Sequence, residues 1–337
     1  MIFHSIDFHN VEEIREDEQG YRLYRFPLSL ADQMDEGAER VSNLSTGIEL
    51  RFKLISDKAV LKLRAEAAEE AQVAYIYFGS FQGGWYLSSK VILEKETEIL
   101  IKRPDNMDIL KKISIEQKLG FNPEVVRVVL PYGRCLFIGI EGDIEVPQKA
   151  DYPNRTYLAY GSSITHGSLA LAMPHTYPFQ IAQKFSYDYL NLGMAGSARL
   201  EKPLAQYLRQ RNDWDFMSME IGINMIKSFD EETFEKRLKE FLAVFKEEHR
   251  PIFVTSIFGY QGELQERASN FREIVRNHAG DPLIFTDGLE LLNKPEYVSQ
   301  DLTHPSLEGI REITEKWFEI MNKELTNYER IENRRQL

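Results

Sequence analysis

The stretch that decides the fold reads Tyr157-Leu158-Ala159-Tyr160-Gly161-Ser162-Ser163-Ile164-Thr165-His166-Gly167. Its first residues are apolar and predict a buried strand, and the glycine-bracketed segment after them predicts a tight turn. A serine in such a turn, Ser163, is a candidate nucleophile if a base lies near it. Far along the same region, Asp301-Leu302-Thr303-His304-Pro305 contains a histidine. Together the two stretches indicate acyl transfer.

Around this stretch, the chain after residue 150 alternates predicted strands with predicted helices. The strands are expected at 156–160, 188–192, 216–221, 252–257 and 283–286. The helices are expected at 177–185, 201–209, 232–248, 264–278 and 306–323. The third helix is supported by one apolar face at helical spacing, formed by Phe234, Leu238, Phe241, Leu242 and Phe245. This alternation predicts an α/β fold with a flavodoxin-like, doubly wound, parallel five-stranded sheet.

Before residue 150 the pattern is different, with about eight short segments rich in β-branched and aromatic residues separated by turns. In 47–54, apolar residues alternate with Glu49, Arg51 and Lys53, which is typical of a half-buried antiparallel strand. We therefore expect an antiparallel β-sandwich, jelly-roll-like, over residues 1–150. The segment 147–153 is the expected linker to an α/β domain over residues 151–337.

Composition limits the class of partner. The chain has 337 residues and a formal net charge of -12, from 53 acidic and 41 basic residues, without a basic cluster. This argues against nucleic acid or an anionic membrane, since binding phosphates requires clustered Lys and Arg. We expect a cytoplasmic protein, because we see neither a secretory signal nor an apolar run of the ~20 residues that span a bilayer. The single Cys135 excludes an intramolecular disulfide and is expected to be a buried core residue.

The loops after the predicted strands carry the candidate chemistry. In open parallel sheets, loops at the carboxyl ends of the strands converge on one edge, where ligands bind. Ser163 follows the first strand, and His304 lies between the fifth strand and the last helix. Histidine can accept the proton of a serine hydroxyl, and Asp301, three residues earlier, can orient the imidazole. The sequence thus predicts Ser163, His304 and Asp301 as nucleophile, base and orienting carboxylate.

The same edge has candidate donors for an oxyanion. Backbone N–H groups of Ser163 and Gly196 and the side-chain amide of Asn224 can supply them, and one such donor is typically worth ~10²- to 10³-fold in rate. Gly196 suits this role because a glycine lets the backbone approach a substrate closely. We expect Gly193, in the same loop, to be structural.

Other interpretations of these residues remain open. Ser163 could be a turn serine that caps the following helix, or part of an anion-binding turn, although the turn lacks the lysine of a P-loop. Asp301 could cap the last helix, and His304 and Asn224 could be ordinary loop residues. His166 and His175 are equally compatible with the wall of a pocket and with a surface loop.

An aromatic group, Phe81, Trp85 and Tyr86, also allows two interpretations. Aromatic faces can stack on sugar rings, so the group could form a binding platform. We expect instead that it belongs to the core of the sandwich, because strands commonly bury aromatic side chains.

Four segments resemble the four conserved blocks of the SGNH or GDSL hydrolase superfamily, in the correct order over residues 156 to about 323. They are Gly161-Ser162-Ser163-Ile164-Thr165, Asn191 to Gly196, Gly222-Ile223-Asn224 and Asp301-Leu302-Thr303-His304. The resemblance implies Ser163, Asp301 and His304 as the catalytic triad and Ser163, Gly196 and Asn224 as the oxyanion hole. Two positions depart from the pattern, Ser162 and Met225, where many relatives have Asp. Neither departure removes a catalytic group.

The β-rich first region is similar to that of two-domain members of this superfamily, including carbohydrate esterases that remove acetyl groups from sugars. The expected function is therefore hydrolysis of short-chain acyl esters, first of all O-acetyl groups on a carbohydrate, with a small-molecule or oligosaccharide ester as substrate. No cofactor and no metal are expected. The alternatives are a catalytically silent carbohydrate-binding protein and a scaffold whose β domain mediates homo-oligomerisation.

Overall fold

The five-stranded sheet after residue 150 has the predicted order and direction. In this computed structural model, which describes residues 1–67 and 70–335, all five strands are parallel and the sheet order is β15-β14-β16-β17-β18. The strands are β14 (Thr156–Gly161), β15 (Asp188–Gly193), β16 (Phe216–Glu220), β17 (Ile252–Thr255) and β18 (Ile284–Thr286). In order along the chain this is 2-1-3-4-5, the flavodoxin-like arrangement. The fold prediction for this region is confirmed.

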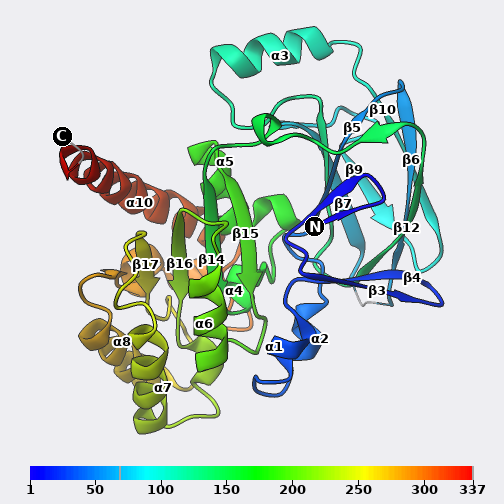
Figure 1. The fold of residues 1–337 in the computed structure, drawn as a ribbon. Coiled ribbons are helices and arrows are strands. Elements are labelled where there is room, and N and C mark those ends of the chain that lie inside the picture. The colour runs from blue at the N-terminus through cyan, green and yellow to red at the C-terminus, as the bar shows by residue number, and fades with distance from the viewer. Residues whose placement is uncertain (68–69, 336–337) are drawn as a thin grey trace.

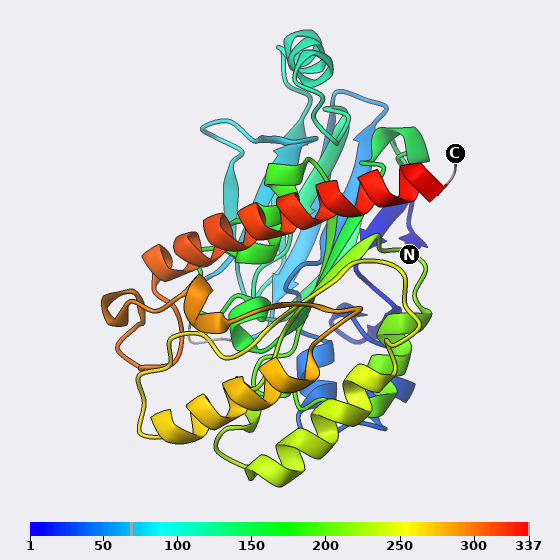
Figure 2. The same cartoon turned by 90° about the vertical axis from the view of Figure 1, so that its left-hand side faces the viewer.

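Helices cover both faces of this sheet (Figures 1 and 2). One face packs against α5 (Tyr177–Phe185) and α10 (Leu307–Arg335), and the other against α6 (Lys202–Gln210), α7 (Glu231–Ala243) and α8 (Gln265–His278). Successive residues of β14 alternate between the two cores, with Leu158 and Tyr160 in one and Tyr157 and Ala159 in the other. Double-sided burial explains why the strands are continuous apolar runs.

Two helix ends differ from the prediction. Helix α10 continues to Arg335 instead of ending at residue 323, since residues 324–335 contain neither Gly nor Pro and Leu325 is still buried. Helix α7 ends at Ala243, five residues before the predicted end. The turn after it has i to i−3 backbone bonds, such as Phe245 N–H to Leu242 O at 3.0 Å, and these keep Phe245 in the core.

Two antiparallel sheets make up the first region. One contains β1 (Ile2–Phe3), β2 (Ile6–His9), β5 (Glu49–Leu54), β7 (Gln72–Phe78), β8 (Phe81–Gln82), β9 (Ser89–Ile92), β11 (Val125–Val129) and β13 (Ile144–Glu145). The other contains β3 (Glu13–Asp17), β4 (Gly20–Tyr24), β6 (Lys58–Ala65), β10 (Thr97–Lys102) and β12 (Cys135–Glu141). Their inner faces share one core, in which Phe8 and Leu50 meet Leu63 and Phe137. This arrangement fits the predicted β-rich sandwich, and Cys135 is buried as expected.

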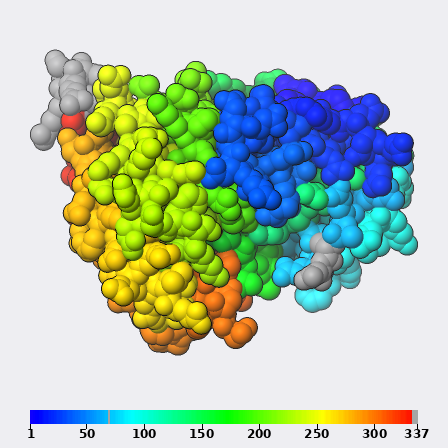
Figure 3. All heavy atoms as spheres, turned by 90° about the horizontal axis from the view of Figure 1, so that it is seen from below, coloured from blue at the N-terminus to red at the C-terminus, as the bar shows by residue number. Residues whose placement is uncertain are grey.

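Several elements of the first region were not predicted. They are the short helices α1 (Leu28–Ala31) and α2 (Ala38–Ser42) and the longer α3 (Met107–Glu116). Figure 1 shows α1 and α2 at the lower end of the sandwich, on the side of the α/β region, and Figure 3 shows this part of the chain against the α/β region. Phe26 and Val41 lie in the same core cluster as strands β14 and β15. The division of the chain at residue 150 stays a prediction.

The prediction that Trp85 and Tyr86 belong to the sandwich core is wrong. These side chains are 90% and 88% exposed. Strand β9 begins only at Ser89, after both aromatic residues, because the chain turns at Gly84, whose carbonyl accepts from Leu87 N–H at 2.8 Å. The turn carries both aromatic side chains beyond the sheet, whereas Phe81 is partly buried.

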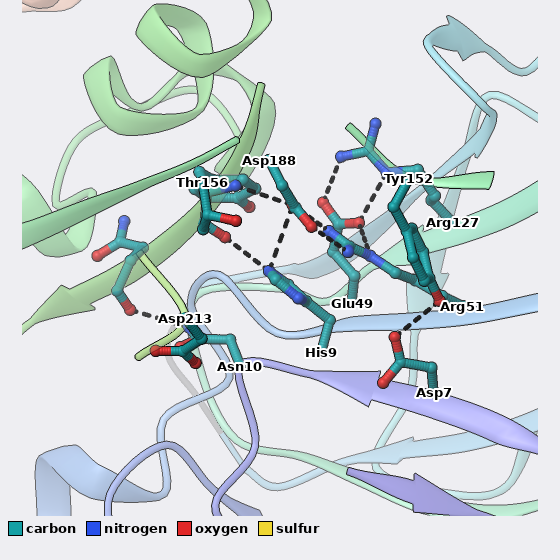
Figure 4. A network of polar contacts seen from close by, with 12 residues as sticks. Asp7, His9, Asn10, Glu49, Arg51, Arg127, Tyr152, Thr156, Asp188 and Asp213 are labelled. Atoms are coloured by element: carbon teal, nitrogen blue, oxygen red, sulfur yellow. Dashed lines mark hydrogen bonds and ion pairs between the residues drawn. The ribbon is translucent and has the colours of Figure 1, made fainter. Parts of the chain in front are cut away.

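The half-buried interpretation of β5 is also wrong, because its polar face is buried as well. Glu49 and Arg51 are 0% and 1% exposed, since this face of the sheet packs on the α/β region (Figure 4). Arg51 donates two hydrogen bonds of 2.6 Å to Asp188 on β15 and one of 2.8 Å to Glu49. Glu49 accepts two more, of 2.6 and 2.8 Å, from Arg127 on β11. We call Glu49, Arg51, Arg127 and Asp188 the interface network.

Charge pairing keeps the interface network ionised. Burial alone would raise the pKa of Glu49, but Arg127 and Arg51 outweigh it and lower that pKa to about 2. Likewise, Arg51 and the nearby His9 outweigh the burial of Asp188 and hold its pKa well below the usual value. Buried carboxylates that are paired and hydrogen-bonded remain charged near neutral pH.

Within residues 1–67 and 70–335, no helix combines the length and apolar character needed to cross a membrane.

Candidate active site

The turn after β14 presents the serine as the sequence predicts. Helix α4 (Ser163–His166) follows at once, and its N-cap is Ser162, whose Oγ accepts from Ile164 N–H at 3.1 Å. The capping role considered for Ser163 therefore belongs to its neighbour. Gly161 is required at the end of the strand, since a Cβ there would overlap Thr165 Oγ1. The hydroxyl of Ser163 is left free for another partner.

That partner is His304. Ser163 Oγ lies 2.7 Å from His304 Nε2, and His304 Nδ1 lies 2.6 Å from Asp301 Oδ2. A carboxylate can only accept, so Nδ1 carries the imidazole proton and Nε2 accepts from the serine hydroxyl. The structure thus joins the three residues in one chain of hydrogen bonds, although Ser163 and His304 are 141 residues apart in sequence.

Asp301 is itself held in place by its own loop. Its Oδ1 accepts from the Ser299 hydroxyl at 2.7 Å and from the backbone N–H groups of Thr303 and His304 at 2.9 Å each. Partial burial would raise the pKa of Asp301, but these bonds and the one from the His304 ring outweigh it and hold that pKa well below the usual value. Asp301 does not cap the last helix, which begins at Leu307.

The loop after β15 forms a tight turn at Gly196. Ser197 N–H donates to Met194 O at 2.9 Å, and Gly196, the third residue of the turn, has φ of 74°. A positive φ at this position is typical of a type II turn, which favours glycine. A Cβ on Gly196 would meet nothing within 4 Å, so the space beside this backbone is open.

Asn224 is joined to this turn. It lies in a short 3₁₀ segment (Ile223–Met225), and its Oδ1 accepts from Ala198 N–H at 3.1 Å. Because the carbonyl oxygen of the amide is used in this way, the NH₂ group is the donor on its other side. A bond of 2.8 Å from Met194 N–H to Gly161 O connects the same turn with the nucleophile turn. Among the described residues, no hydrogen bond joins Gly196 or Asn224 to the Ser163 hydroxyl itself.

Glu220 is a site residue that the sequence analysis missed. This residue ends β16 and is 1% exposed, and its Oε2 accepts from Ser162 N–H at 2.7 Å and from the Ser162 hydroxyl at 2.6 Å. The Thr165 hydroxyl lies 3.2 Å from the same oxygen. Burial raises the pKa of Glu220 above its usual value, although these hydrogen bonds act in the opposite direction. Glu220 therefore anchors both ends of the nucleophile turn from below, and only its place at the end of a strand could have indicated this.

The two histidines near Ser163 in sequence, His166 and His175, differ in their surroundings. His166 is fully buried, with Nδ1 at 2.8 Å from Gly193 O, so neither the pocket-wall nor the surface interpretation holds for it. Burial, followed by the charge of Arg25, keeps the pKa of His166 well below its usual value. His175 is exposed, in agreement with the surface alternative. Among the residues that the structure describes, no three His, Cys, Asp or Glu side chains form a group suited to a metal ion.

Comparison with family models matches residues 154–286 to the GDSL-like lipase/acylhydrolase family. The matched residues lie within the α/β region and include all five strands of its sheet. The match includes Ser163, Gly196 and Asn224, while the segment with Asp301 and His304 lies beyond it. In a comparison with curated protein sequences, nothing matches this chain.

Solved structures share the architecture of the α/β region together with the β-rich region. A salicylyl-acyltransferase from a tetracycline biosynthetic pathway superposes with a TM-score of 0.71 at 16% identity, covering 93% of each chain. A putative GDSL-like lipase from Bacteroides ovatus gives 0.66 at 17% identity, covering 90% of this chain and 92% of that one. A family two carbohydrate esterase from Clostridium thermocellum, in complex with cellohexaose, gives 0.55 at 12% identity, covering 84% and 94%. At these sequence identities, the comparisons show that the fold is shared and nothing beyond it.

Proposed function

We propose that the protein is a serine esterase that hydrolyses short-chain acyl esters through an acyl-enzyme intermediate. One observation carries the proposal, namely the hydrogen-bonded chain from Ser163 Oγ to His304 Nε2 at 2.7 Å and from His304 Nδ1 to Asp301 at 2.6 Å. A serine paired with an oriented imidazole is the arrangement that activates a hydroxyl for attack on a carbonyl. The match of residues 154–286 to the GDSL-like lipase/acylhydrolase family supports hydrolase chemistry at this site.

In the proposed reaction, His304 takes the proton of Ser163 as the hydroxyl oxygen bonds to the ester carbonyl carbon. Asp301 stabilises the imidazolium that forms, and the backbone of Ser163 and Gly196 and the amide of Asn224 donate to the oxyanion. Collapse of the tetrahedral intermediate releases the alcohol, which takes the proton from His304. Water then attacks the acyl-enzyme by the same steps, releases the acid and restores the Ser163 hydroxyl.

For the substrate, we propose an O-acetylated carbohydrate. The reacting groups lie near the surface, with 23% of the His304 side chain and 43% of the Asp301 side chain exposed. A shallow site accepts a small acyl group on a large alcohol, such as an oligosaccharide. Carbohydrate esterases among the fold neighbours support this choice, including one solved with cellohexaose.

The test is hydrolysis of p-nitrophenyl acetate by wild type, Ser163→Ala and Ser168→Ala. Ser168 is a matched control, since its hydroxyl contacts Tyr132 at 2.9 Å and takes no part in the proposed chain. We expect Ser163→Ala to lower kcat by at least about 10³-fold and Ser168→Ala to stay close to wild type. An inactive wild type would favour the silent carbohydrate-binding or scaffold alternatives, and full activity in Ser163→Ala would refute the serine mechanism.

The substrate proposal has its own test. Acetate release is measured from a panel of acetylated oligosaccharides, with each deacetylated sugar as a competitor. Turnover on the panel with no preference over p-nitrophenyl acetate would contradict the carbohydrate substrate and leave only the esterase proposal.

We also propose a cytoplasmic location and, should copies of the chain associate, contact through the β-rich region. Gel filtration and cell fractionation test these two points.

A further inference from the structure

Strand β15 lies at one edge of the parallel sheet, so one row of its carbonyls has no neighbouring strand to bond. Side chains from the first region take the place of that strand. His9 Nε2 lies 2.6 Å from Tyr189 O, and Asn10 Nδ2 donates to Asn191 O at 3.0 Å. Arg25 Nη1 then donates to Asn191 O and to Gly193 O, at 3.0 Å each. The row is thus covered up to the end of the strand.

Arg25 also donates to two further backbone carbonyls. Its Nε donates to Leu44 O and its Nη2 to Val41 O, at 2.9 Å each, and Nη2 also lies 3.4 Å from His166 Nδ1. The side chain is fully buried, and no carboxylate in the described part of the chain forms an ion pair with it. Burial lowers the pKa of Arg25 to about 9, which still leaves a cation at neutral pH. A buried, unpaired charge is costly, which argues for a specific role.

The carbonyl of Gly193 is the last one that Arg25 holds. His166 Nδ1 lies 2.8 Å from the same oxygen, and because a carbonyl only accepts, Nδ1 carries the proton and donates. A Cβ on Gly193 would overlap the backbone of His166, so strand end and nucleophile helix are in direct contact. Two donors and a close contact therefore fix the chain immediately before Met194.

Residues 194–198, which we call the oxyanion turn, start from this fixed point. The turn contains Gly196, and its Ala198 N–H orients the amide of Asn224 at 3.1 Å. The first region also touches the turn directly, because Gly37 approaches so closely that a Cβ on it would lie 2.8 Å from Ser197 Oγ. Both proposed oxyanion donors outside the nucleophile turn thus depend on where residue 193 is held.

We propose that Arg25 is a positioning residue through which the first region of the chain holds the oxyanion turn in place for catalysis. The inference rests on the proposed function. A guanidinium suits the task, because its planar fork reaches carbonyls on two sides at once, whereas a lysine ammonium is a single point of charge. The β-rich region would then be part of the support of the active site instead of an appended module.

The test compares Arg25→Lys with Asn10→Ala in the full-length protein, using p-nitrophenyl acetate. Both substitutions remove donors from the same row of carbonyls, but Asn10 does not bind Gly193. We expect Arg25→Lys to lower kcat by about 10-fold or more with KM within about 3-fold, since small displacements of oxyanion donors are felt mainly in the transition state. Asn10→Ala should keep kcat within about 3-fold of wild type.

Two further readouts separate positioning from general destabilisation. Inhibition by phenylboronic acid, whose tetrahedral serine adduct places an oxygen among the oxyanion donors, should weaken in Arg25→Lys by a factor similar to the loss in kcat. Hydrogen exchange of the amides at 194–198 should quicken in Arg25→Lys and not in Asn10→Ala. If Arg25→Lys does not fold, His166→Leu, which removes the other donor to Gly193, takes its place in all three measurements.

The outcomes are distinct for the two proposals. A folded Arg25→Lys with kcat and boronate affinity within about 3-fold of wild type would overturn the positioning role, and so would equal losses in Arg25→Lys and Asn10→Ala. If wild type shows no Ser163-dependent turnover, the proposed function fails. Hydrogen exchange then decides the positioning claim alone, where equal exchange at 194–198 in both variants overturns it.

Discussion

Two groups of polar side chains in this molecule are built from short hydrogen bonds, namely the serine chain of Ser163, His304 and Asp301 and the interface network. They differ in how far their side chains are exposed to solvent. In the interface network each carboxylate is paired with an arginine, and Glu49 and Arg51 are 0% and 1% exposed. In the serine chain, solvent reaches the reacting groups, with 23% of the His304 side chain exposed. Close polar contacts alone do not make a reactive site. The accessible hydroxyl at the end of the chain distinguishes the candidate active site from a structural cluster.

The largest effect expected from this comparison is on catalysis and not on folding. His304→Gln should lower kcat for p-nitrophenyl acetate by about 10³-fold or more, because Ser163 loses its base. The free energy of unfolding, measured with urea, should change by less than about 1 kcal/mol, since the side chain is partly exposed. His175→Gln is the control, as this histidine is exposed and outside the chain. Similar kcat losses in both variants would contradict the assignment of the base.

The reverse pattern is expected for the interface network. Arg51→Met leaves Asp188 and Glu49 buried with one cation fewer and should cost about 3–5 kcal/mol of unfolding free energy. For the folded fraction, kcat should stay within about 3-fold of wild type. The control Lys184→Met removes a partner of the exposed Glu315 and should cost less than about 1 kcal/mol. An Arg51→Met variant as stable as this control would show that the network contributes no net stability.

Acid should weaken the interface network before it affects the apolar cores. The pKa of Glu49 in the folded state, about 2, lies below the ordinary 4.5 that applies when the chain unfolds. The charged form therefore stabilises the fold above about pH 4.5, and this contribution is lost as the pH falls toward 2. Urea unfolding curves at several pH values measure this dependence. The curves of wild type and Glu49→Gln should converge toward pH 2, and a constant separation would refute the assignment.

Glu220 combines features of both groups, since it is buried like the network and bonded to the nucleophile turn. Glu220→Ala leaves Ser162 N–H and two hydroxyls without their acceptor, so we expect a loss of about 1–3 kcal/mol in unfolding free energy and about 10-fold in kcat. Glu220→Gln keeps an acceptor oxygen and should recover most of both. Equal kcat losses in the two variants would show that the charge of Glu220 matters more than the anchoring of the turn.

The smallest effect is expected at Trp85. Because this side chain is 90% exposed, Trp85→Ala should change the unfolding free energy by less than about 0.5 kcal/mol. Trp317, which lies on α10 and is fully buried, is the matched control, and its replacement by alanine should cost about 3–5 kcal/mol. Thermal or urea unfolding of the two variants measures the difference. A large loss from Trp85→Ala would restore the core interpretation that the structure contradicts.

The same contrast explains which parts of the molecule could be predicted. The strands of the parallel sheet were found to within one or two residues because each is a buried apolar run bounded by turn residues, and Asp301 and His304 meet through a separation of only three residues. Asp188 and Arg51 lie 137 residues apart, and nothing local in either segment indicates the partner. The alternation in β5 correctly gave its apolar face but could not show that its polar face would be covered. Glu220 and Arg25 were missed for the same reason, because their roles depend on carbonyls and amides of distant loops.

The covered edge of β15 also bears on whether another strand can add to the parallel sheet there. An edge strand with free carbonyls is a template on which another copy of the strand can add, and proteins generally blunt such edges. In this protein the carbonyls of the edge strand are occupied by single side chains. His9, Asn10 and Arg25 are each hydrogen-bonded to backbone oxygens of β15. These three side chains thus occupy the carbonyls with which a further strand would have to pair at the β15 edge.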